Sequence, residues 1–278
     1  HYDFVPPAPY DTMFDPDYTG TMDGRMFIER DDVNPKMDPR DLDHIKALYD
    51  GEIRFTDEHV GRILDRLRAK GVLDSTVVMI VSDHGDEFFE HGNKGHHRTV
   101  YDEVLHIPFA LRLPPDAGHA GKAVDAQVTL LDVFPTLLDA AGFTPPAGAE
   151  GESLVGWLNG KAPARDAIYS DFYDKRGFNL QVARRTPAAK TIQHFNRITH
   201  PKRGSLEYYD LATDAAESDN RADQHPAELA VSVSAMTGWL EQQWRAHRHL
   251  EGGAGGNASI EIDEETQKRL ESLGYVGD

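Results

Sequence analysis

The sequence predicts an α/β fold followed by a smaller antiparallel sheet. Residues 77–82 form an almost unbroken apolar, mostly β-branched run, which is typical of a strand buried on both faces. Residues 41–70 carry apolar side chains at helical spacing. From about residue 164 to 212 the pattern changes to short alternating segments separated by turns, which favours antiparallel strands. These patterns give three predicted regions: an α/β part at 1–163, a sheet and helix at 164–250, and a Gly-rich linker with a terminal helix at 251–278.

The first 70 residues are predicted to form a loop and then one long helix. Residues 1–40 are rich in Pro and Asp, which favour turns and extended chain. The helical face that follows ends at Gly71, a natural stop, and consists of Ile53, Val60, Leu64 and Leu67. Asp57 falls on the same face, four residues after Ile53, where a carboxylate is costly unless it is bonded. We therefore expect Asp57 to pair with a cation or cap a loop, in a structural role.

Polar residues take over abruptly where the predicted strand at 77–82 ends, in Ser82-Asp83-His84-Gly85. Ligands of open α/β sheets bind just beyond the carboxyl ends of parallel strands, and an Asp with a neutral His can hold a divalent cation there. Gly85 allows the backbone to turn sharply behind the pair. For an isolated Asp–His pair, an ordinary polar turn would be the favoured interpretation. Cations and imidazoles that follow closely favour an anion pocket beside a metal: Lys94, His96, His97 and Arg98.

The segment from Ser82 to Pro108 resembles the second half of a sulfatase of the alkaline-phosphatase superfamily. The order and spacing of five short motifs carry this resemblance: Ser82-Asp83-His84-Gly85, Glu90-His91-Gly92, Gly95-His96, Tyr101-Asp102-Glu103 and His106-Ile107-Pro108. The resemblance implies a three-layer sandwich around a mixed central sheet, here incomplete, with a small C-terminal antiparallel sheet and helix.

The resemblance implies a role for several side chains. Asp83 and His84 would be metal ligands, with Ca²⁺ the expected ion. In this family a Lys or His that contacts the sulfate lies four or five residues before the Tyr of Tyr-Asp-Glu, which corresponds to His97 or His96. We favour His96 and leave His97 open. Lys94 lies seven residues before that Tyr and is interpreted as a loop charge.

His1 is a third candidate catalytic residue. His1-Tyr2-Asp3 followed by Pro9-Tyr10 resembles a family segment whose His contacts the sulfate or the leaving group. A second His usually precedes the Pro-Tyr pair, but Pro7 or Ala8 stands at that position here, which weakens the match. A terminal His without a role is an equal interpretation.

The nucleophile of such an enzyme is not recognisable in this sequence. The family uses a formylglycine, made from the Cys or Ser of a Cys/Ser-x-Pro-x-Arg motif, and two more acidic metal ligands near its N-terminus. The chain contains no Cys, and no Ser-x-Pro-x-Arg occurs. It begins at His1 rather than Met and shows no signal-peptide pattern. We therefore expect a piece of a longer enzyme, which lacks the first half of the catalytic domain and is inactive alone.

Composition argues against some functions, and the family resemblance leaves three. The net charge of −18 argues against nucleic-acid binding, and no apolar run approaches the ~20 residues of a membrane span. The first function is hydrolysis of a sulfate ester of a small molecule or carbohydrate, by a protein that the family resemblance would place in the periplasm or outside the cell. The second is a phosphodiesterase or phosphonate monoester hydrolase of the same superfamily. The third is a non-catalytic binding chain. Oligomeric state is not predicted.

Overall fold

The computed structural model describes residues 3–96, 98–115, 121, 123–146, 148–161, 163, 165–173, 179–196 and 204–252. The chain divides into two compact units, His1–Val233 and Ser234–Asp278. The predicted division between residues 163 and 164 remains a prediction. The predicted Gly-rich linker and terminal helix fall almost entirely outside the described residues.

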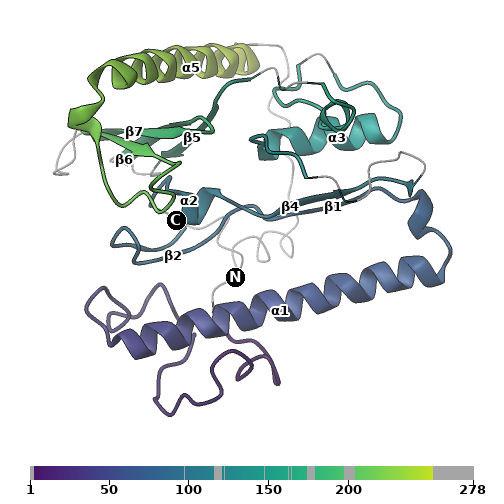
Figure 1. Cartoon of the computed structure of the whole chain (residues 1–278), viewed down its shortest axis with the longest axis vertical. Coiled ribbons are helices and arrows are strands. Elements are labelled where there is room, and N and C mark those ends of the chain that lie inside the picture. Colours follow the sequence, from purple (N-terminus) through teal and green to yellow (C-terminus); the bar gives the residue numbers. More distant parts are fainter. Residues whose placement is uncertain are drawn as a thin grey trace. The chain divides into compact units, whose positions relative to one another are not determined.

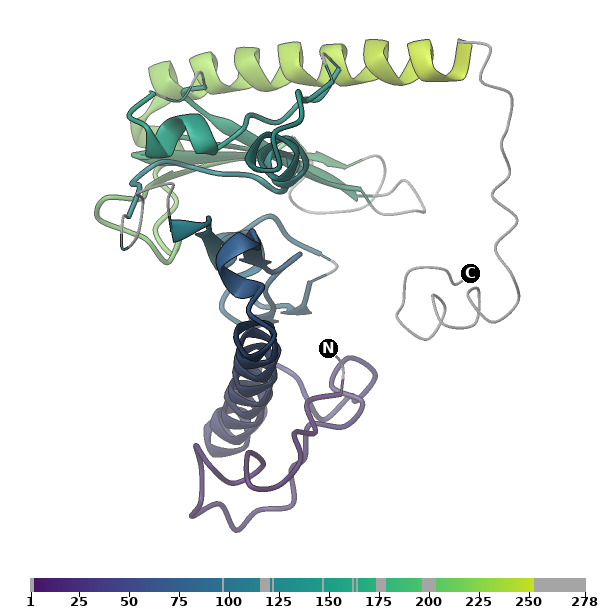
Figure 2. The same cartoon turned by 90° about the vertical axis from the view of Figure 1, so that its right-hand side faces the viewer.

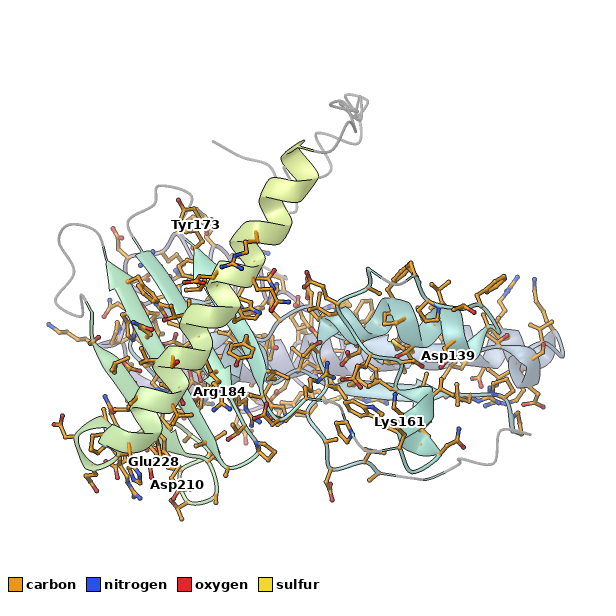
Figure 3. The ribbon with its side chains drawn as sticks, turned by 90° about the horizontal axis from the view of Figure 1, so that it is seen from above. Asp139, Lys161, Tyr173, Arg184, Asp210 and Glu228 are labelled. Carbon is orange, nitrogen blue, oxygen red and sulfur yellow. The ribbon has the colours of Figure 1, made fainter. Side chains whose placement is uncertain are left out.

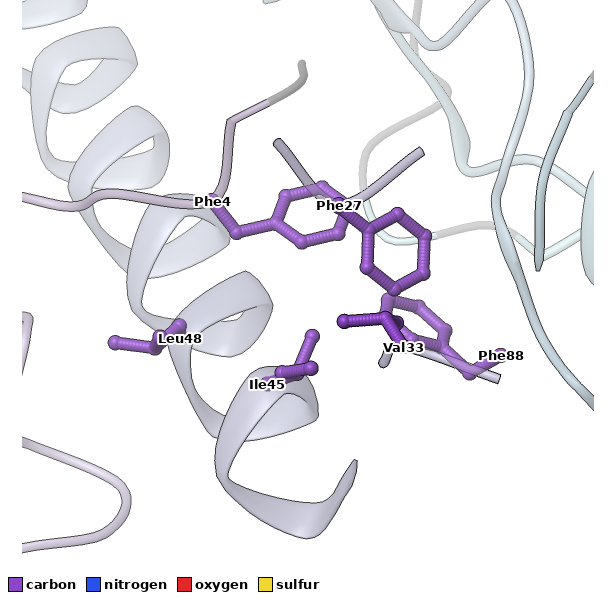
Figure 4. Packing of buried hydrophobic residues seen from close by; sticks show 6 residues of the cluster. All are labelled: Phe4, Phe27, Val33, Ile45, Leu48 and Phe88. Carbon is purple, nitrogen blue, oxygen red and sulfur yellow. The ribbon is translucent and has the colours of Figure 1, made fainter. Parts of the chain in front are cut away.

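The N-terminal part is a loop that packs on the first turns of a long helix, as predicted. The loop makes an isolated bridge between Phe4 and Gly24. Helix α1 (Pro39–Ala69) begins after Asp38, whose carboxylate accepts a hydrogen bond from the backbone N–H of Arg40. The loop, α1 and strand β2 share one apolar cluster, shown in Figure 4, of Phe4, Phe27, Val33, Ile45, Leu48 and Phe88.

The predicted apolar face of α1 is buried only in part. The buried residues of α1 are His44, Ile45, Leu48 and Gly51, which lie in its first half. From the predicted face, Val60, Leu64 and Leu67 are half-buried, whereas Ile53 is 52% exposed. Asp57 is exposed and pairs with Arg54 at 2.9 Å, in agreement with the predicted pairing with a cation.

The strand that precedes Asp83 is paired differently from the prediction. A short 3₁₀ turn (η1, Leu73–Ser75) leads into β1 (Val78–Val81), which pairs antiparallel with β4 (Phe109–Arg112), side by side in Figure 1. Within the described residues β1 therefore has no parallel neighbour. Burial on both faces is also wrong, since Ile80 is 41% exposed. Two strands alone leave a backbone edge and part of each face uncovered.

The residues between β1 and β4 form a small hairpin and one helical turn. Strand β2 (Glu87–Phe88) pairs antiparallel with β3 (Lys94–Gly95), so that Glu87 lies opposite Gly95. Helix α2 (Asp102–Leu105) follows. Val100 and Tyr101, just before α2, are buried against the C-terminal sheet in a cluster with Ala183, Ile192 and Tyr209. The hairpin is thereby fixed between the α1 cluster and that sheet.

Residues 130–140 form two consecutive helical segments. The 3₁₀ turn η3 (Leu130–Asp132) leads directly into α3 (Val133–Ala140), and Gly142 after it has φ +82°, as expected of a helix C-terminus. Thr129 and Asp132 form a reciprocal capping box, which stabilises the start. Helix α4 (Val155–Leu158) follows.

The predicted C-terminal antiparallel sheet is confirmed. Its strands run in chain order, β5 (Ile168–Tyr173), β6 (Asn179–Arg185), β7 (Ala189–Asn196) and β8 (Leu206–Asp210). Figure 2 shows this sheet nearly edge-on, and in Figure 3 Tyr173, Arg184 and Asp210 come from it, whereas Asp139 and Lys161 come from the α3–α4 region. After η4 (Ala222–Gln224), the predicted helix is α5 (Pro226–Gly252), in which Leu229 and Met236 are buried.

Candidate active site

Asp83 and His84 lie directly after β1, as the sequence predicted. Nδ1 of His84 is 2.9 Å from the carbonyl oxygen of Gly85, so it carries a proton that it donates, and in the neutral ring the lone pair is on Nε2. Nε2 lies 3.8 Å from Oδ2 of Asp83. Two such atoms at this separation can bind one cation between them, which fits the predicted pair of ligands.

Asp83 and His84 differ in their surroundings. Asp83 is at the edge of a cavity of about 640 Å³ between the end of β1 and the C-terminal sheet, and His84 is not among the residues that line this cavity. The His84 ring stacks on His96, with centroids 3.6 Å apart. The predicted metal pair therefore lies beside this cavity and next to a second imidazole.

His96 lies beside the predicted metal pair. Its Nδ1 is 2.9 Å from Oδ1 of Asp86, and the two side chains are 8% and 7% exposed. One ligand atom from each of His84, Asp86 and His96 lies within 4.8 Å of the others. The structure thus brings together residues that were singled out separately, and it adds Asp86, which sequence reasoning missed although it directly follows Gly85.

Gly85 makes this arrangement sterically possible. A Cβ on Gly85 would lie 2.1 Å from the carbonyl oxygen of Glu103, and its N–H donates to the carbonyl of Val104 at 2.8 Å. The expected sharp turn therefore has a specific cause, because the backbone at Gly85 contacts the backbone of α2 directly.

Lys94 points away from His96. Its ammonium donates to the carbonyl oxygens of Arg30 and Val33, both at 2.8 Å, and burial lowers its pKa. It also lies over the ring of Phe27. Lys94 thus anchors the N-terminal loop from strand β3.

His91 joins the hairpin to the C-terminal part of unit 1. Its Nδ1 is 2.5 Å from the Glu103 carboxylate and its Nε2 is 2.9 Å from the carbonyl oxygen of Glu217. Both partners are acceptors, so both nitrogens carry protons and the ring is an imidazolium. Burial acts to lower the pKa of His91, but the hydrogen bonds to Glu103 and Glu217 raise it to about 8. With both nitrogens protonated, His91 is not available as a metal ligand.

Asp102 is held in a buried charge network and is not a metal ligand. Lys190, with a fully buried side chain, lies 2.8 Å from Asp102 and 2.9 Å from Glu217, and Arg185 lies 2.9 Å from Asp102. Burial acts to raise the pKa of Asp102, but Lys190 and Arg185 bring it below its usual value. Burial raises the pKa of Glu217. Asp102, the aspartate of the Tyr-Asp-Glu motif, therefore has a structural role.

Two predicted site residues, His1 and His97, lie outside the described residues. Their predicted roles stay predictions, and the choice between His96 and His97 rests on the position of His96 alone.

Known families match almost the whole described chain. A sulfatase family model matches residues 3–143, and a model described as N-sulphoglucosamine sulphohydrolase, C-terminal, matches residues 90–243. The chain belongs to the sulfatase family. This confirms the resemblance drawn from the motifs between Ser82 and Pro108.

A curated relative of this chain is the N-acetylglucosamine-6-O-sulfatase of Bacteroides thetaiotaomicron, 33% identical over 215 residues, which are 72% of this chain and 36% of the relative. The chain therefore spans about a third of that relative's length.

Two solved structures share the fold. One, a complex with its substrate D-glucosamine-2-N,6-O-disulfate, is 26% identical with a TM-score of 0.57, over 78% of this chain and 43% of that one. The other, a phosphonate monoester hydrolase from Silicibacter pomeroyi, is 22% identical with a TM-score of 0.63, over 87% and 53%. The predicted alkaline-phosphatase-like α/β fold is confirmed. Among the described residues, no helix has the length and apolarity to cross a bilayer.

Proposed function

We propose that this chain is the C-terminal part of a sulfuric ester hydrolase and supplies part of its metal site and its sulfate pocket. The observation that carries the proposal is the position of His96, stacked on His84 directly after the strand that presents Asp83. A metal held by Asp83 and His84 would polarise a sulfate oxygen. His96 would donate a proton in a hydrogen bond to the sulfate or to the leaving oxygen.

Asp83 and His84 fit a Ca²⁺ site to which other residues also contribute. Ca²⁺ takes six to eight ligands, mostly oxygens, and Asp83 offers a carboxylate beside the lone pair of His84. The remaining ligands and the formylglycine nucleophile would come from the part of the enzyme that this chain does not span. We propose Ca²⁺ as the ion on this basis.

A sulfated amino sugar is the first substrate to test, because the curated relative is named for the 6-O-sulfate of N-acetylglucosamine. The experiment measures inorganic sulfate released by the full-length protein from N-acetylglucosamine 6-sulfate and from an aryl sulfate. A phosphonate monoester is assayed in parallel, since a hydrolase of that class shares the fold. Sulfate release with loss of activity in chelator supports the proposal.

Two results would contradict the proposal. Faster cleavage of the phosphonate would assign the protein to phosphoryl chemistry. A stable full-length protein without activity on either class, and without heat of Ca²⁺ binding in calorimetry, would make it a non-catalytic binding chain. The same family relationship supports a periplasmic or secreted location, which cell fractionation with an antibody to the chain tests.

A further inference from the structure

The strand register places Asp86 and His96 opposite each other. Glu87 pairs with Gly95 in the β2–β3 hairpin. Asp86 precedes Glu87 and His96 follows Gly95, so in an antiparallel pair these two residues are the next to face each other. Their side chains make the contact that this register allows, Nδ1 of His96 to Oδ1 of Asp86 at 2.9 Å.

The backbone on both sides of this pair is fixed. Gly85, next to Asp86, contacts the carbonyl of Glu103 and donates to that of Val104. Gly95, next to His96, is buried and has φ +77°, a conformation that few other residues adopt. Both side chains are more than nine-tenths buried. A buried, geometrically constrained carboxylate–imidazole pair holds the ring in one orientation and one tautomer.

We propose that Asp86 is a positioning residue for His96. Its carboxylate accepts the Nδ1 proton of His96 and so directs Nε2 of that ring toward the sulfate ester. The direction of Nε2 toward a sulfate ester rests on the proposed function, whereas the bond from His96 to Asp86 concerns this chain alone.

The geometry favours positioning over direct metal binding by Asp86. The His84 and His96 rings stack nearly parallel, 25° apart. Nδ1 of each ring faces an oxygen acceptor, the Gly85 carbonyl for His84 and Asp86 for His96. A metal that took Nδ1 of His96 would have to displace the bond between that nitrogen and Asp86.

The first test reads the His96 tautomer by long-range ¹H–¹⁵N correlation in the 278-residue chain, at a pH where the ring is neutral. We expect the Nδ1–H form in the parent chain. In Asp86→Asn the Nε2–H form should gain population, because an amide can donate to Nδ1. The matched control is Asp57→Asn, which removes one exposed carboxylate and should leave the tautomer unchanged.

The second test uses the full-length enzyme. Asp86→Asn should lower kcat by about 10–100-fold, as is typical of residues that orient a functional His, with KM changed much less. Asp86→Glu should restore part of kcat, because it keeps the acceptor. Circular dichroism of each variant checks that it folds.

The outcomes distinguish the positioning role of Asp86 from the proposed sulfatase function. An Nε2–H tautomer of His96 in the parent chain, or the Nδ1–H form retained in both Asp86→Asn and Asp86→Ala, overturns the positioning role. Weaker binding of Co²⁺ to Asp86→Asn with an unchanged His96 tautomer would make Asp86 a metal ligand and also overturn it. An enzyme without sulfatase activity whose His96 tautomer still follows Asp86 would refute the proposed function and keep the positioning.

Discussion

At the scale of single residues, the side chains of Lys94 and His96 on either side of Gly95 have different environments. Lys94 reaches back to the carbonyls of Arg30 and Val33, which hold its ammonium in the N-terminal loop. His96 turns toward His84 and Asp86. The role of Lys94 is therefore in stability, and that of His96 is proposed to be in turnover.

We predict that His96→Ala lowers kcat of the full-length enzyme by about 10²–10⁴-fold, the usual range for a positioned acid–base group. Lys94→Ala serves as the comparison and should lower thermal stability with a mild effect on kcat. Steady-state kinetics on a sulfate ester and thermal melts of both variants check this. A severe loss of kcat in Lys94→Ala, together with a near-normal kcat in His96→Ala, would refute the placement of the sulfate pocket.

Sequence reasoning at this scale found the residues but not their partners. Asp83, His84 and His96 were recognisable because the family's spacing marks them. Asp86 was missed because its function depends on a cross-strand contact in a hairpin of two-residue strands. The β-branched, alternating pattern that marks longer strands is absent from such short ones.

At the scale of elements, His91 connects the hairpin and α2 to the loop that precedes η4. The His91 ring lies between Glu103 and the carbonyl of Glu217, and it stacks on Tyr101 with centroids 3.6 Å apart. A second carboxylate, that of Glu87, accepts a hydrogen bond from the backbone N–H of His91. The connection is strongest while the ring is charged.

We predict that the chain loses stability as the pH rises through about 8. The folded-state pKa of His91 is raised from 6.5 to about 8, so its contribution is complete below pH 6.5 and is lost as the pH passes the folded value. A difference of about 1.5 pKa units corresponds to about 2 kcal/mol. Urea unfolding between pH 6 and 9.5 measures this loss of stability.

His91→Gln should remove most of this pH dependence and destabilise the chain at pH 6. The matched control is His59→Gln on α1, where Nδ1 bonds the carbonyl of Phe55 within its own helix. The control should keep the pH dependence of the parent. Identical pH profiles for His91→Gln and the parent would disprove the role of His91.

We also predict that Lys190→Ala destabilises the chain by about 3–5 kcal/mol, because it leaves Asp102 and Glu217 buried without their shared cation. Lys161→Ala, at an exposed position after α4, is the control and should change stability by less than about 0.5 kcal/mol. Denaturant melts at pH 7 compare the two. Equal effects would mean that Arg185 alone neutralises Asp102.

The elements themselves were predicted unequally well. The four C-terminal strands followed from their short alternating sequence segments and the turns between them. The pairing of β1 did not follow, since an apolar run gives no information on the direction of its neighbour. The apolar residues of α1 beyond Gly51 are half-buried or exposed, because full burial also needs a packing partner, which the sequence pattern does not reveal.

At the scale of the whole molecule, the chain spans about a third of its curated relative, and several large apolar side chains are exposed, among them Ile53, Ile63, Phe134 and Phe143. The family and fold could be predicted from the sequence because the motifs between Ser82 and Pro108 are specific. The substrate could not, because it is selected by loops that carry no such motif.

We predict that the chain alone binds Ca²⁺ weakly. Asp83 and His84 cannot supply the six to eight contacts that the ion prefers, and binding would have to order surrounding loops. Isothermal titration calorimetry of residues 1–278 should show a Kd in the millimolar range or no heat, whereas the full-length enzyme should bind stoichiometrically. Tight one-to-one binding by the chain would refute this prediction.

The bond from His91 to Glu217 also constrains the order of folding. It closes a loop of 126 residues, and the charge pairs of Lys190 with Asp102 and Glu217 close loops of 88 and 27. Contacts so distant in the chain form after local ones, because loop closure costs entropy before the contact stabilises anything. The β5–β8 meander, whose strands pair in chain order, can therefore form first, and the bonds that join it to Asp102 and His91 form late. Substitutions at Lys190 should accordingly accelerate unfolding more than they slow refolding in stopped-flow experiments.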